Sequence, residues 1–321
     1  MIIITGAAGF IGSNFISKLN DEGIKDIVIV DDFSNNLKNR NIEHKSFLCK
    51  IDREQFFKWF NENWRQVEFI AHIGARTDTA ESDKKVFDRL NLGYSRMVWN
   101  YCVKYNIPLI YASSAATYGL GEHGFADDHE LVERLKPLNL YGESKNEFDK
   151  WVLKQKATPP YWTGIKFFNV YGPNEYHKGR MASVILHAYN QLSKTGRIKL
   201  FRSHNAGYKD GEQKRDFIYI KDILDALFFL MNNRKGSGIY NLGTGTARTF
   251  LDLAENIFKA AGKEKNIEFI DTPEDIREKY QYFTEAEMNK LRLAGYSKEF
   301  TPVESGIEEY VNFYLTGMKY N

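Results

Sequence analysis

The sequence has few cysteines and no long hydrophobic run. Its two cysteines, Cys49 and Cys102, lie far apart and form no C-x-x-C pair, which argues against a disulfide framework or a zinc site, so no metal is expected. No stretch approaches the roughly 18 apolar residues of a membrane span, and the apolar N-terminus has strand length without a basic leader region. We therefore expect a cytoplasmic protein with no membrane partner.

An excess of charge of one sign is missing as well. The 44 lysines and arginines nearly balance the 42 aspartates and glutamates, giving a formal net charge of +2, and the basic residues are scattered. A concentrated basic patch is the electrostatic footprint of nucleic-acid binding, so no nucleic-acid partner is expected. A small anionic substrate is compatible with this charge balance.

The 321 residues alternate between apolar strands and helix-like segments. This alternation predicts an α/β fold, a Rossmann-type doubly wound parallel sheet with a smaller C-terminal substrate domain. Regular alternation stops after Tyr171-Gly-Pro, so we expect a dinucleotide-binding domain at 1–170 and 217–245, and a substrate domain at 171–216 and 246–321. The predicted strands are 2–5, 26–31, 69–72, 108–113, 163–168, 199–201 and 238–242, with crossover helices at 86–105 and 144–155.

Three spaced glycines follow the first strand and precede a helix expected at 13–19. That order is the context in which a glycine fingerprint indicates dinucleotide binding. Gly6 would allow the tight turn, Gly9 would let the backbone approach a pyrophosphate, and Gly12 would let the helix lie close to the sheet. The helix N-terminus would offer free N–H groups to the phosphates.

Two carboxylates end the second predicted strand. Asp31 lies 19 residues beyond Gly12, close to the offset at which an acidic side chain binds the adenosine ribose, and Asp32 follows it. Two carboxylates favour NAD, whereas nearby Lys38 and Arg53 could neutralise one of them and accommodate NADP. The choice between the two dinucleotides stays open at this point, and so does an ordinary solvated turn.

A Y-x-x-x-K pair, Tyr141 and Lys145, follows the strand that ends near Ser114. Residues four apart share one face of a helix, so the phenol and the ammonium would point at one site. A nearby ammonium and a cationic nicotinamide ring would together favour the phenolate, so we expect Lys145 to tune the pKa of Tyr141. Ser114, at the carboxyl end of a strand, would hydrogen-bond the same substrate hydroxyl that Tyr141 deprotonates.

Together these motifs resemble the extended short-chain dehydrogenase/reductase family, whose nucleotide-sugar epimerases and dehydratases combine T-G-x-x-G-F-I-G, S-S-x-x-x-Y-G and Y-x-x-x-K. The resemblance covers nearly the whole chain and includes KRDFIYIKD at 214–222 and YNLGTG at 240–245. Segments 111–119, 168–173 and 177–184, with Tyr280-Gln281, are similar to members that epimerise carbon 6 of an ADP-linked heptose. The resemblance implies NADP, with NAD as the alternative, an ADP-sugar substrate, and a homo-oligomer, specifically a pentamer.

Site residues are implied by the same resemblance. The catalytic pair would be Tyr141 and Lys178, assisted by Ser114 and Lys145. Substrate contacts would come from Ser114, Asn169, Arg180, His187, Phe201, Arg202, Ser203, His204, Arg215 and Tyr280. Cofactor contacts would come from Gly6, Gly9, Phe10, Ile11, Gly12, Asp31, Asp32, Lys38, Arg53, Ile73, Gly74, Ala75, Arg76, Thr77, Asn91, Lys145, Val170 and Lys178.

Four features depart from the family pattern. Asp32 stands where NADP-using members have Asn, Ile73 stands where Glu is usual, Arg53 replaces a lysine, and the loop from 202 to 214 is longer. Two alternative functions remain at this stage. One is a UDP- or GDP-sugar 4-epimerase or 4,6-dehydratase, and the other is a catalytically silent NAD(P)-binding regulator.

Overall fold

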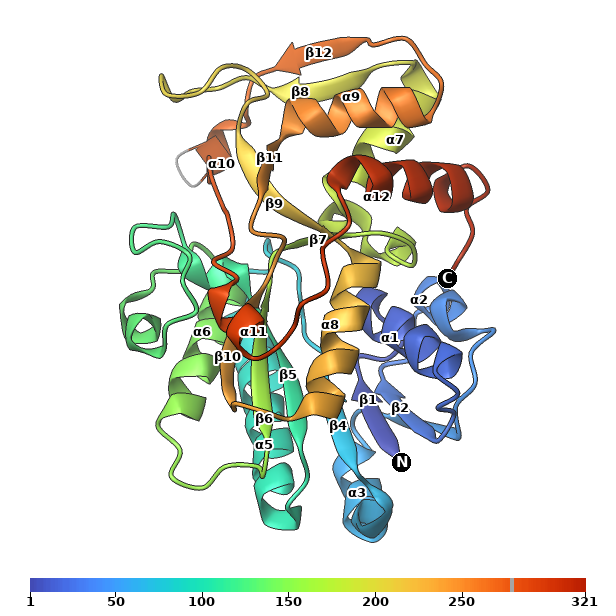
Figure 1. Cartoon of the computed structure of the whole chain (residues 1–321), viewed down its shortest axis with the longest axis vertical. Helices are drawn as coiled ribbons and strands as arrows, with labels where there is room; N and C mark the ends of the chain where they lie inside the picture. Colours follow the sequence, from blue (N-terminus) through green and yellow to red (C-terminus); the bar gives the residue numbers. More distant parts are fainter. Residues whose placement is uncertain (278–279) are drawn as a thin grey trace.

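A computed structural model describes residues 1–277 and 280–321 of the chain (Figure 1). A parallel sheet flanked by helices forms one part of the molecule, and a smaller part built from the later sequence lies beyond one end of that sheet. None of the helices among the described residues is long and apolar enough to cross a membrane.

Seven strands make the main sheet, in the order β10-β6-β5-β4-β1-β2-β3, and every neighbouring pair is parallel. The order reverses between β1 and β4, and such a switch point is where open α/β sheets bind ligands. The strands are β1 (Ile2–Thr5), β2 (Ile27–Asp31), β3 (Cys49–Asp52), β4 (Phe69–His72), β5 (Leu109–Ser114), β6 (Trp162–Phe167) and β10 (Gly238–Leu242).

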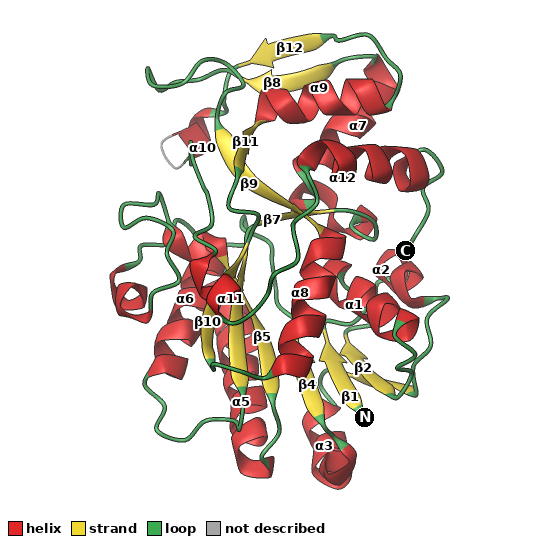
Figure 2. Cartoon of the chain, in the orientation of Figure 1, coloured by secondary structure: helices red, strands yellow, loops and turns green. Residues whose placement is uncertain are grey.

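Helices cover both faces of this sheet (Figure 2). Because strand side chains alternate, Ile2 and Ile4 of β1 join one buried core while Ile3 joins the other. The first core includes residues of α1 (Phe10–Asp21) and α8 (Ile220–Asn233), and the second includes residues of α3 (Phe56–Asn63), α5 (Tyr94–Tyr105) and α6 (Leu140–Leu153). Shorter helices are α2 (Asn36–Asn39) and α4 (Lys84–Phe87).

The smaller part contains two further sheets. One has the order β11-β9-β7, and the other pairs β12 with β8. The strands are β7 (Asn169–Tyr171), β8 (Ile198–Phe201), β9 (Lys214–Tyr219), β11 (Ala247–Thr249) and β12 (Ile267–Ile270). The helices here are α7 (Val184–Thr195), α9 (Phe250–Ala260), α10 (Glu274–Arg277), α11 (Asn289–Leu293) and α12 (Val303–Glu309).

The predicted Rossmann-type α/β class is confirmed, with corrections to individual elements. The helix expected at 144–155 begins at Leu140, because the Asn139 side chain caps it by accepting from the Gly142 N–H at 2.9 Å. The helix expected at 86–105 runs from Lys84 and includes a π-helical turn at Asp88–Gly93. Strands β3, β7, β9, β11 and β12 were not predicted. The division into two domains at 170/171, 216/217 and 245/246 stays a prediction.

Candidate active site

The glycine turn joins β1 to α1. Gly6 has a φ of +67°, and a Cβ on it would lie 2.4 Å from the Cα of Gly74, so only glycine fits. A Cβ on Gly12 would lie 2.2 Å from the Gly6 carbonyl oxygen, so Gly12 lets the helix close on its own turn rather than on the sheet. Gly9 is the N-cap residue and supplies no side-chain hydrogen bond to α1.

This turn borders a cavity of about 420 Å³. Amides in the first turn of a helix lack partners within the helix, and at α1 no side chain caps them, so this N-terminus suits an anionic pyrophosphate. The residues present therefore fit a dinucleotide. Of the predicted cofactor residues, those that line the cavity are Gly6, Gly9, Phe10, Ile11, Gly12, Asp31, Lys38, Arg53, Ile73, Gly74, Ala75, Arg76, Thr77 and Lys178.

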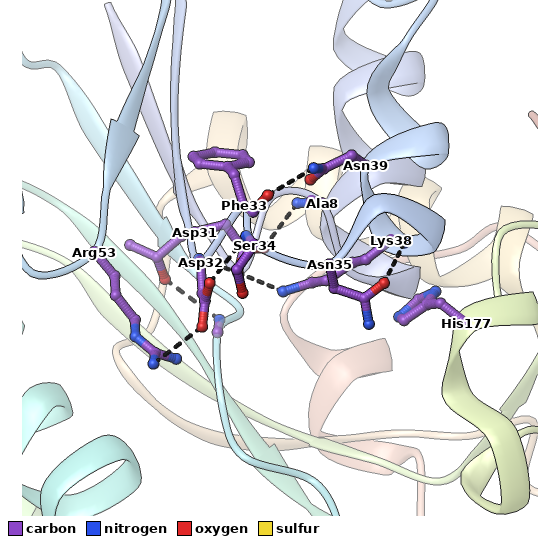
Figure 3. Close-up of polar contacts among 12 residues, drawn as sticks. Ala8, Asp31, Asp32, Phe33, Ser34, Asn35, Lys38, Asn39, Arg53 and His177 are labelled. Atoms are coloured by element: carbon purple, nitrogen blue, oxygen red, sulfur yellow. Dashed lines mark hydrogen bonds and ion pairs between the residues drawn. The ribbon is translucent and has the colours of Figure 1, made fainter.

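Asp31, the last residue of β2, lines this cavity, and its polar contacts are drawn in Figure 3. Its carboxylate accepts from the Ala8 N–H at 2.9 Å and from the Asp32 N–H at 2.7 Å. Lys38, from α2, pairs with the same carboxylate. The side chain of Asp31 is thus fixed on three sides, with its position set by the glycine turn and by α2.

Asp32 does not line the cavity as described, although it was predicted to contact the cofactor. It pairs with Arg53, whose Nη2 lies 3.2 Å from Oδ2, and accepts from the Ser34 N–H at 3.0 Å (Figure 3). Hydrogen bonds from Ser34 are the largest effect that lowers the pKa of Asp32, and the charge of Arg53 adds to it. Both cations that favour NADP are therefore engaged by carboxylates.

His72 was not predicted, yet it lies in the cavity wall at the end of β4. Its Nδ1 is 2.6 Å from Thr5 Oγ1 and its Nε2 is 2.8 Å from Ser95 Oγ. Burial, and to a lesser extent the charge of Lys145, lowers the pKa of His72 to about 3, so the ring is neutral. A lone histidine ending a strand carries no spacing signal, which is why the sequence did not reveal it.

Asn91 is hydrogen-bonded to the backbone of Arg76, a residue of the cavity wall, without lining the cavity itself. Its Oδ1 accepts from the Arg76 N–H at 2.8 Å, and its Nδ2 donates to the Arg76 carbonyl at 3.0 Å. The same Nδ2 donates to Ser144 Oγ at 2.9 Å, and Ser144 donates to the Tyr141 carbonyl at 2.7 Å. Asn91 is 1% exposed and so connects the wall to the start of α6.

Ser114, Tyr141 and Lys145 come together where β5 ends and α6 begins. Burial raises the pKa of Tyr141, and a hydrogen bond with Ser114 opposes that shift. Lys145 Nζ donates to the Ala112 carbonyl at 2.7 Å, and burial lowers its pKa to about 8. In the protein alone, burial outweighs the other effects on the pKa of Tyr141, and Lys145 donates to a carbonyl. The shift expected with a cationic nicotinamide beside Tyr141 stays a prediction. None of these three residues is in the described lining of the cavity, but Asn91 and Ser144 link the Tyr141 backbone to Arg76 of the cavity wall, and the charge of Lys145 acts on His72.

Lys178 approaches from a separate segment, the 3-10 helix Tyr176–Met181. Its Nζ lies 5.3 Å from the centre of the Phe10 ring, above the start of α1. Burial lowers the pKa of Lys178, and the charge of Glu175 partly offsets this. Arg180, predicted to contact substrate, lines the same cavity as Lys178, while Val170 of β7 is only half-buried and is not in the described lining.

Most of the remaining substrate residues lie in the smaller part of the molecule. The Phe201 and Tyr280 rings are 6.0 Å apart, and the Arg215 guanidinium is 5.5 Å from the Tyr280 ring. The Arg215 guanidinium donates to the carbonyls of Lys214 and Gln281, so some of its N–H groups are already hydrogen-bonded within the protein. Phe201, Arg215 and Tyr280 thus lie together, and their contact with substrate stays a prediction.

The loop residues of this set are held by polar contacts. Arg202 lies 3.5 Å from Asp271, and the Ser203 N–H donates to Asp210 at 2.8 Å. The His204 N–H donates to the Tyr282 hydroxyl at 3.0 Å. Asn169 begins β7 and is exposed, and His187 of α7 lies 3.3 Å from the Arg180 carbonyl. No cluster of three or more potential metal ligands occurs at 1–277 or 280–321.

Comparison with known proteins adds a family and a set of relatives. The model of the NAD dependent epimerase/dehydratase family matches residues 2–243. The chain is 49% identical to the ADP-L-glycero-D-manno-heptose-6-epimerase of Fusobacterium nucleatum, over 98% of each chain. It is 46% identical to the protein of the same name from Nitratidesulfovibrio vulgaris, again over 98% of each.

Among solved structures, the chain resembles the Helicobacter pylori ADP-L-glycero-D-manno-heptose-6-epimerase, with a TM-score of 0.79 and 26% identity over 97% of this chain and 94% of that one. The Thermus thermophilus UDP-glucose 4-epimerase in complex with NAD gives a TM-score of 0.76 at 22% identity, over 97% of each chain, and that likeness concerns the fold alone. Both resemblances extend over the two parts of the molecule.

Proposed function

We propose that this chain, which belongs to the NAD-dependent epimerase/dehydratase family and uses a nicotinamide cofactor, interconverts ADP-D-glycero-D-manno-heptose and ADP-L-glycero-D-manno-heptose at carbon 6. The product would supply inner-core heptose for lipopolysaccharide. Relatives named for this activity support the proposal at 41–49% identity over nearly the full length. Proteins named for 4-epimerase activity support only the fold, at 17–22% identity.

The observation that carries the proposal is the presence of two separate proton-exchanging groups near one dinucleotide cavity. Tyr141 is hydrogen-bonded to Ser114 at the carboxyl end of β5, with Lys145 on the same helix face. Lys178 lines the cavity from a different segment. A sugar carbon inverted through a ketone needs a proton acceptor for each epimer, so two groups on separate segments suit this reaction.

A nicotinamide held in this cavity would supply a reversible hydride acceptor for carbon 6, so that the same carbon can be oxidised on one face and reduced on the other. Tyr141 Oη takes the hydroxyl proton of one epimer, and Lys178 Nζ takes that of the other. Ser114 Oγ orients the reacting oxygen. The predicted subsite at Phe201, Arg215 and Tyr280 holds the ADP end, which leaves the sugar free to turn while its far end stays fixed.

We propose NADP as the preferred cofactor, with NAD as the alternative. Lys38 supports this, because it stands beside Asp31, the residue predicted to bind the ribose, and Arg53 stands beside Asp32. Replacing Lys38 with alanine is expected to weaken NADP binding while leaving NAD binding largely intact, as measured by calorimetric titration of both. An unchanged ratio of the two affinities would contradict the NADP assignment.

The proposal extends to the assembly and location of the protein. We also propose that the protein is a homo-oligomer, specifically a pentamer, in the cytoplasm, as the family resemblance of the sequence implies. The remaining predicted contacts of the cofactor and the substrate, including Asp32, Asn91, Val170, Asn169 and His187, are part of this proposal.

Product analysis by NMR tests the function. Purified protein is incubated separately with ADP-heptose, UDP-hexoses and GDP-hexoses. We expect epimerisation at carbon 6 of the ADP-heptose alone. Inversion at carbon 4 of a UDP-hexose, without action on ADP-heptose, would assign the chain to the 4-epimerases instead.

A further inference from the structure

A fully buried ion pair joins α6, the helix that carries Tyr141 and Lys145, to strand β6. Asp149 of α6 and Lys166 of β6 are both 0% exposed, and Lys166 Nζ is 2.9 Å from Asp149 Oδ2. The Asp149 carboxylate also accepts from the Ser113 hydroxyl at 2.6 Å and from the Tyr111 hydroxyl at 3.0 Å. Lys166 Nζ donates in addition to Thr117 Oγ1 at 2.6 Å. Burying two charges is costly unless their remaining donors and acceptors are satisfied, as they are here.

The contacts of this pair lead to the reacting residues. Thr117 Oγ1 donates to the Ser114 carbonyl at 2.8 Å, so Lys166 is linked through one hydroxyl to the backbone of Ser114. Lys145 donates to the carbonyl of Ala112 in the same strand, one helical turn before Asp149. Consecutive residues from Tyr111 to Ser114 are thus each held by a polar contact: Asp149 accepts from Tyr111 and Ser113, and the carbonyls of Ala112 and Ser114 accept from Lys145 and Thr117.

We propose that Asp149 and Lys166 are positioning residues, which fix the end of β5 so that Ser114, Tyr141 and Lys145 keep their mutual geometry during the reaction. The proposal rests on the proposed function for the identity of the reaction. A hydrophobic pair would fill the same space and would be as stable or more so, so stability alone does not require the ions. A small displacement at a reacting group, by contrast, costs about 10²-fold in rate.

Kinetics of matched variants test the proposal. In Asp149→Asn the kcat is expected to fall by about 10²-fold, while the KM for substrate and the Kd for dinucleotide change less than about twofold. The double variant Asp149→Asn/Lys166→Met removes both charges at once, so its urea midpoint should exceed that of the single variant. Its kcat should nevertheless stay low. A double variant that regains wild-type kcat together with stability would overturn the proposal.

Two further variants separate positioning from general loss of stability. Thr117→Val cuts the link from Lys166 to Ser114 and keeps the ion pair, so kcat should fall, while the urea midpoint drops no further than in a variant that loses buried hydrogen bonds elsewhere. Asp222→Asn is the control. Asp222 of α8 is 3% exposed and accepts hydrogen bonds from the backbone N–H and the hydroxyl of Thr301, away from the site. This control should lower the midpoint and leave kcat unchanged. Wild-type kcat in folded Thr117→Val would overturn the proposal.

A titration that needs no substrate separates this proposal from the function. The titratable groups whose charges act with that of Lys145 are Asp149 from its own helix and His72 from the end of β4. Burial lowers the pKa of Lys145, and Asp149 counteracts that shift. In lysine-¹³C NMR, Asp149→Asn should therefore move the Lys145 titration to lower pH, and Asp222→Asn should not. An unmoved titration contradicts the pair's influence on Lys145, whereas a wild type that ignores ADP-heptose contradicts only the proposed function.

Discussion

Tyr141 is the residue on which the proposed proton transfer depends most. Replacing it with phenylalanine removes the hydroxyl and little else, so kcat should fall by about two to four orders of magnitude, the usual contribution of general acid–base catalysis. Dinucleotide binding should persist, since the cavity lining does not include Tyr141. Steady-state kinetics and a thermal shift with dinucleotide measure the two effects.

The matched control for that variant is Tyr219→Phe. Tyr219 is buried in β9, and its hydroxyl donates to Glu309 at 3.0 Å, away from the reacting groups. This variant loses one buried hydroxyl as well and should keep wild-type kcat. Near-normal turnover in Tyr141→Phe would show that the Y-x-x-x-K pair is structural in this chain.

His72 predicts a pH dependence of stability. Its pKa is lowered to about 3 by burial, below the ordinary value of about 6.5 for the unfolded chain, so the unfolded state binds more protons between these values. The contribution to stability is therefore complete above about pH 6.5 and is lost as the pH falls toward 3, at up to about 1.4 kcal/mol per pH unit.

Urea unfolding of wild type and His72→Gln between pH 7 and pH 4 measures this contribution. The free energy of unfolding should fall less steeply with decreasing pH in His72→Gln. Other buried groups, such as His177 with a pKa lowered to about 4 by burial, contribute equally to both proteins. Parallel curves for the two proteins would show that His72 is protonated in the folded state.

Some of these residues could be identified from the sequence and others could not, for a physical reason. Tyr141 and Lys145 could be identified from the sequence because residues four apart lie on the same face of a helix. Asp149 and Lys166 lie 17 residues apart, one on helix α6 and the other on strand β6. No spacing rule predicts which residue of a helix contacts which residue of the next strand. Lys178 required the family resemblance, because a lysine in a loop is ordinarily a solvated residue.

At the scale of elements, the β1 turn makes a prediction about glycine. Gly6→Ala should both strain a φ of +67° and place its Cβ against Gly74, which forces the cavity wall to move. We expect a loss of stability together with a loss of the thermal shift caused by dinucleotide. Gly23→Ala is the matched control, since its φ is +80° with no atom within 4 Å of the added Cβ.

The control should cost only the left-handed conformation, about 1–2 kcal/mol, and retain the dinucleotide shift. Equal behaviour of the two alanine variants in the presence of dinucleotide would mean that the close approach of Gly6 to Gly74 has no role in binding. Differential scanning fluorimetry with and without dinucleotide gives the comparison directly.

Strands were predictable where they are buried on both faces. β1 and β4 occupy the predicted residues, because continuous apolar runs identify the inner strands of a parallel sheet. β10 also occupies its predicted residues, because all of its residues are buried although it lies at one edge of the sheet. β3 escaped prediction because it is an edge strand, Cys49–Asp52, in which partly buried and exposed residues alternate. β9 begins with Lys214, Arg215 and Asp216, so it lacks the continuous apolar run on which strand prediction relied, although it pairs with β7 and β11.

At the scale of the whole molecule, the chain order explains how one site draws on distant segments. The sheet provides the glycine turn, the ends of β4 and β5, and the start of α6 at its carboxyl edge. After β6, the chain leaves this sheet, passes through the loop that carries Lys178, and returns to it with β10. Sequence patterns predicted the sheet, whereas the meeting of Lys178 with the start of α1 depends on the path of the chain in space.

One measurement tests the central claim, epimerisation by transient oxidation at carbon 6, most directly. ADP-heptose carrying deuterium at carbon 6 is incubated with the protein in ordinary water and followed by NMR. Transient oxidation at carbon 6 predicts a mixture of both epimers with the deuterium retained at carbon 6, because the deuterium leaves and returns as deuteride without exchanging with solvent. Epimerisation accompanied by replacement of the deuterium with solvent hydrogen, or no epimerisation at all, would contradict it.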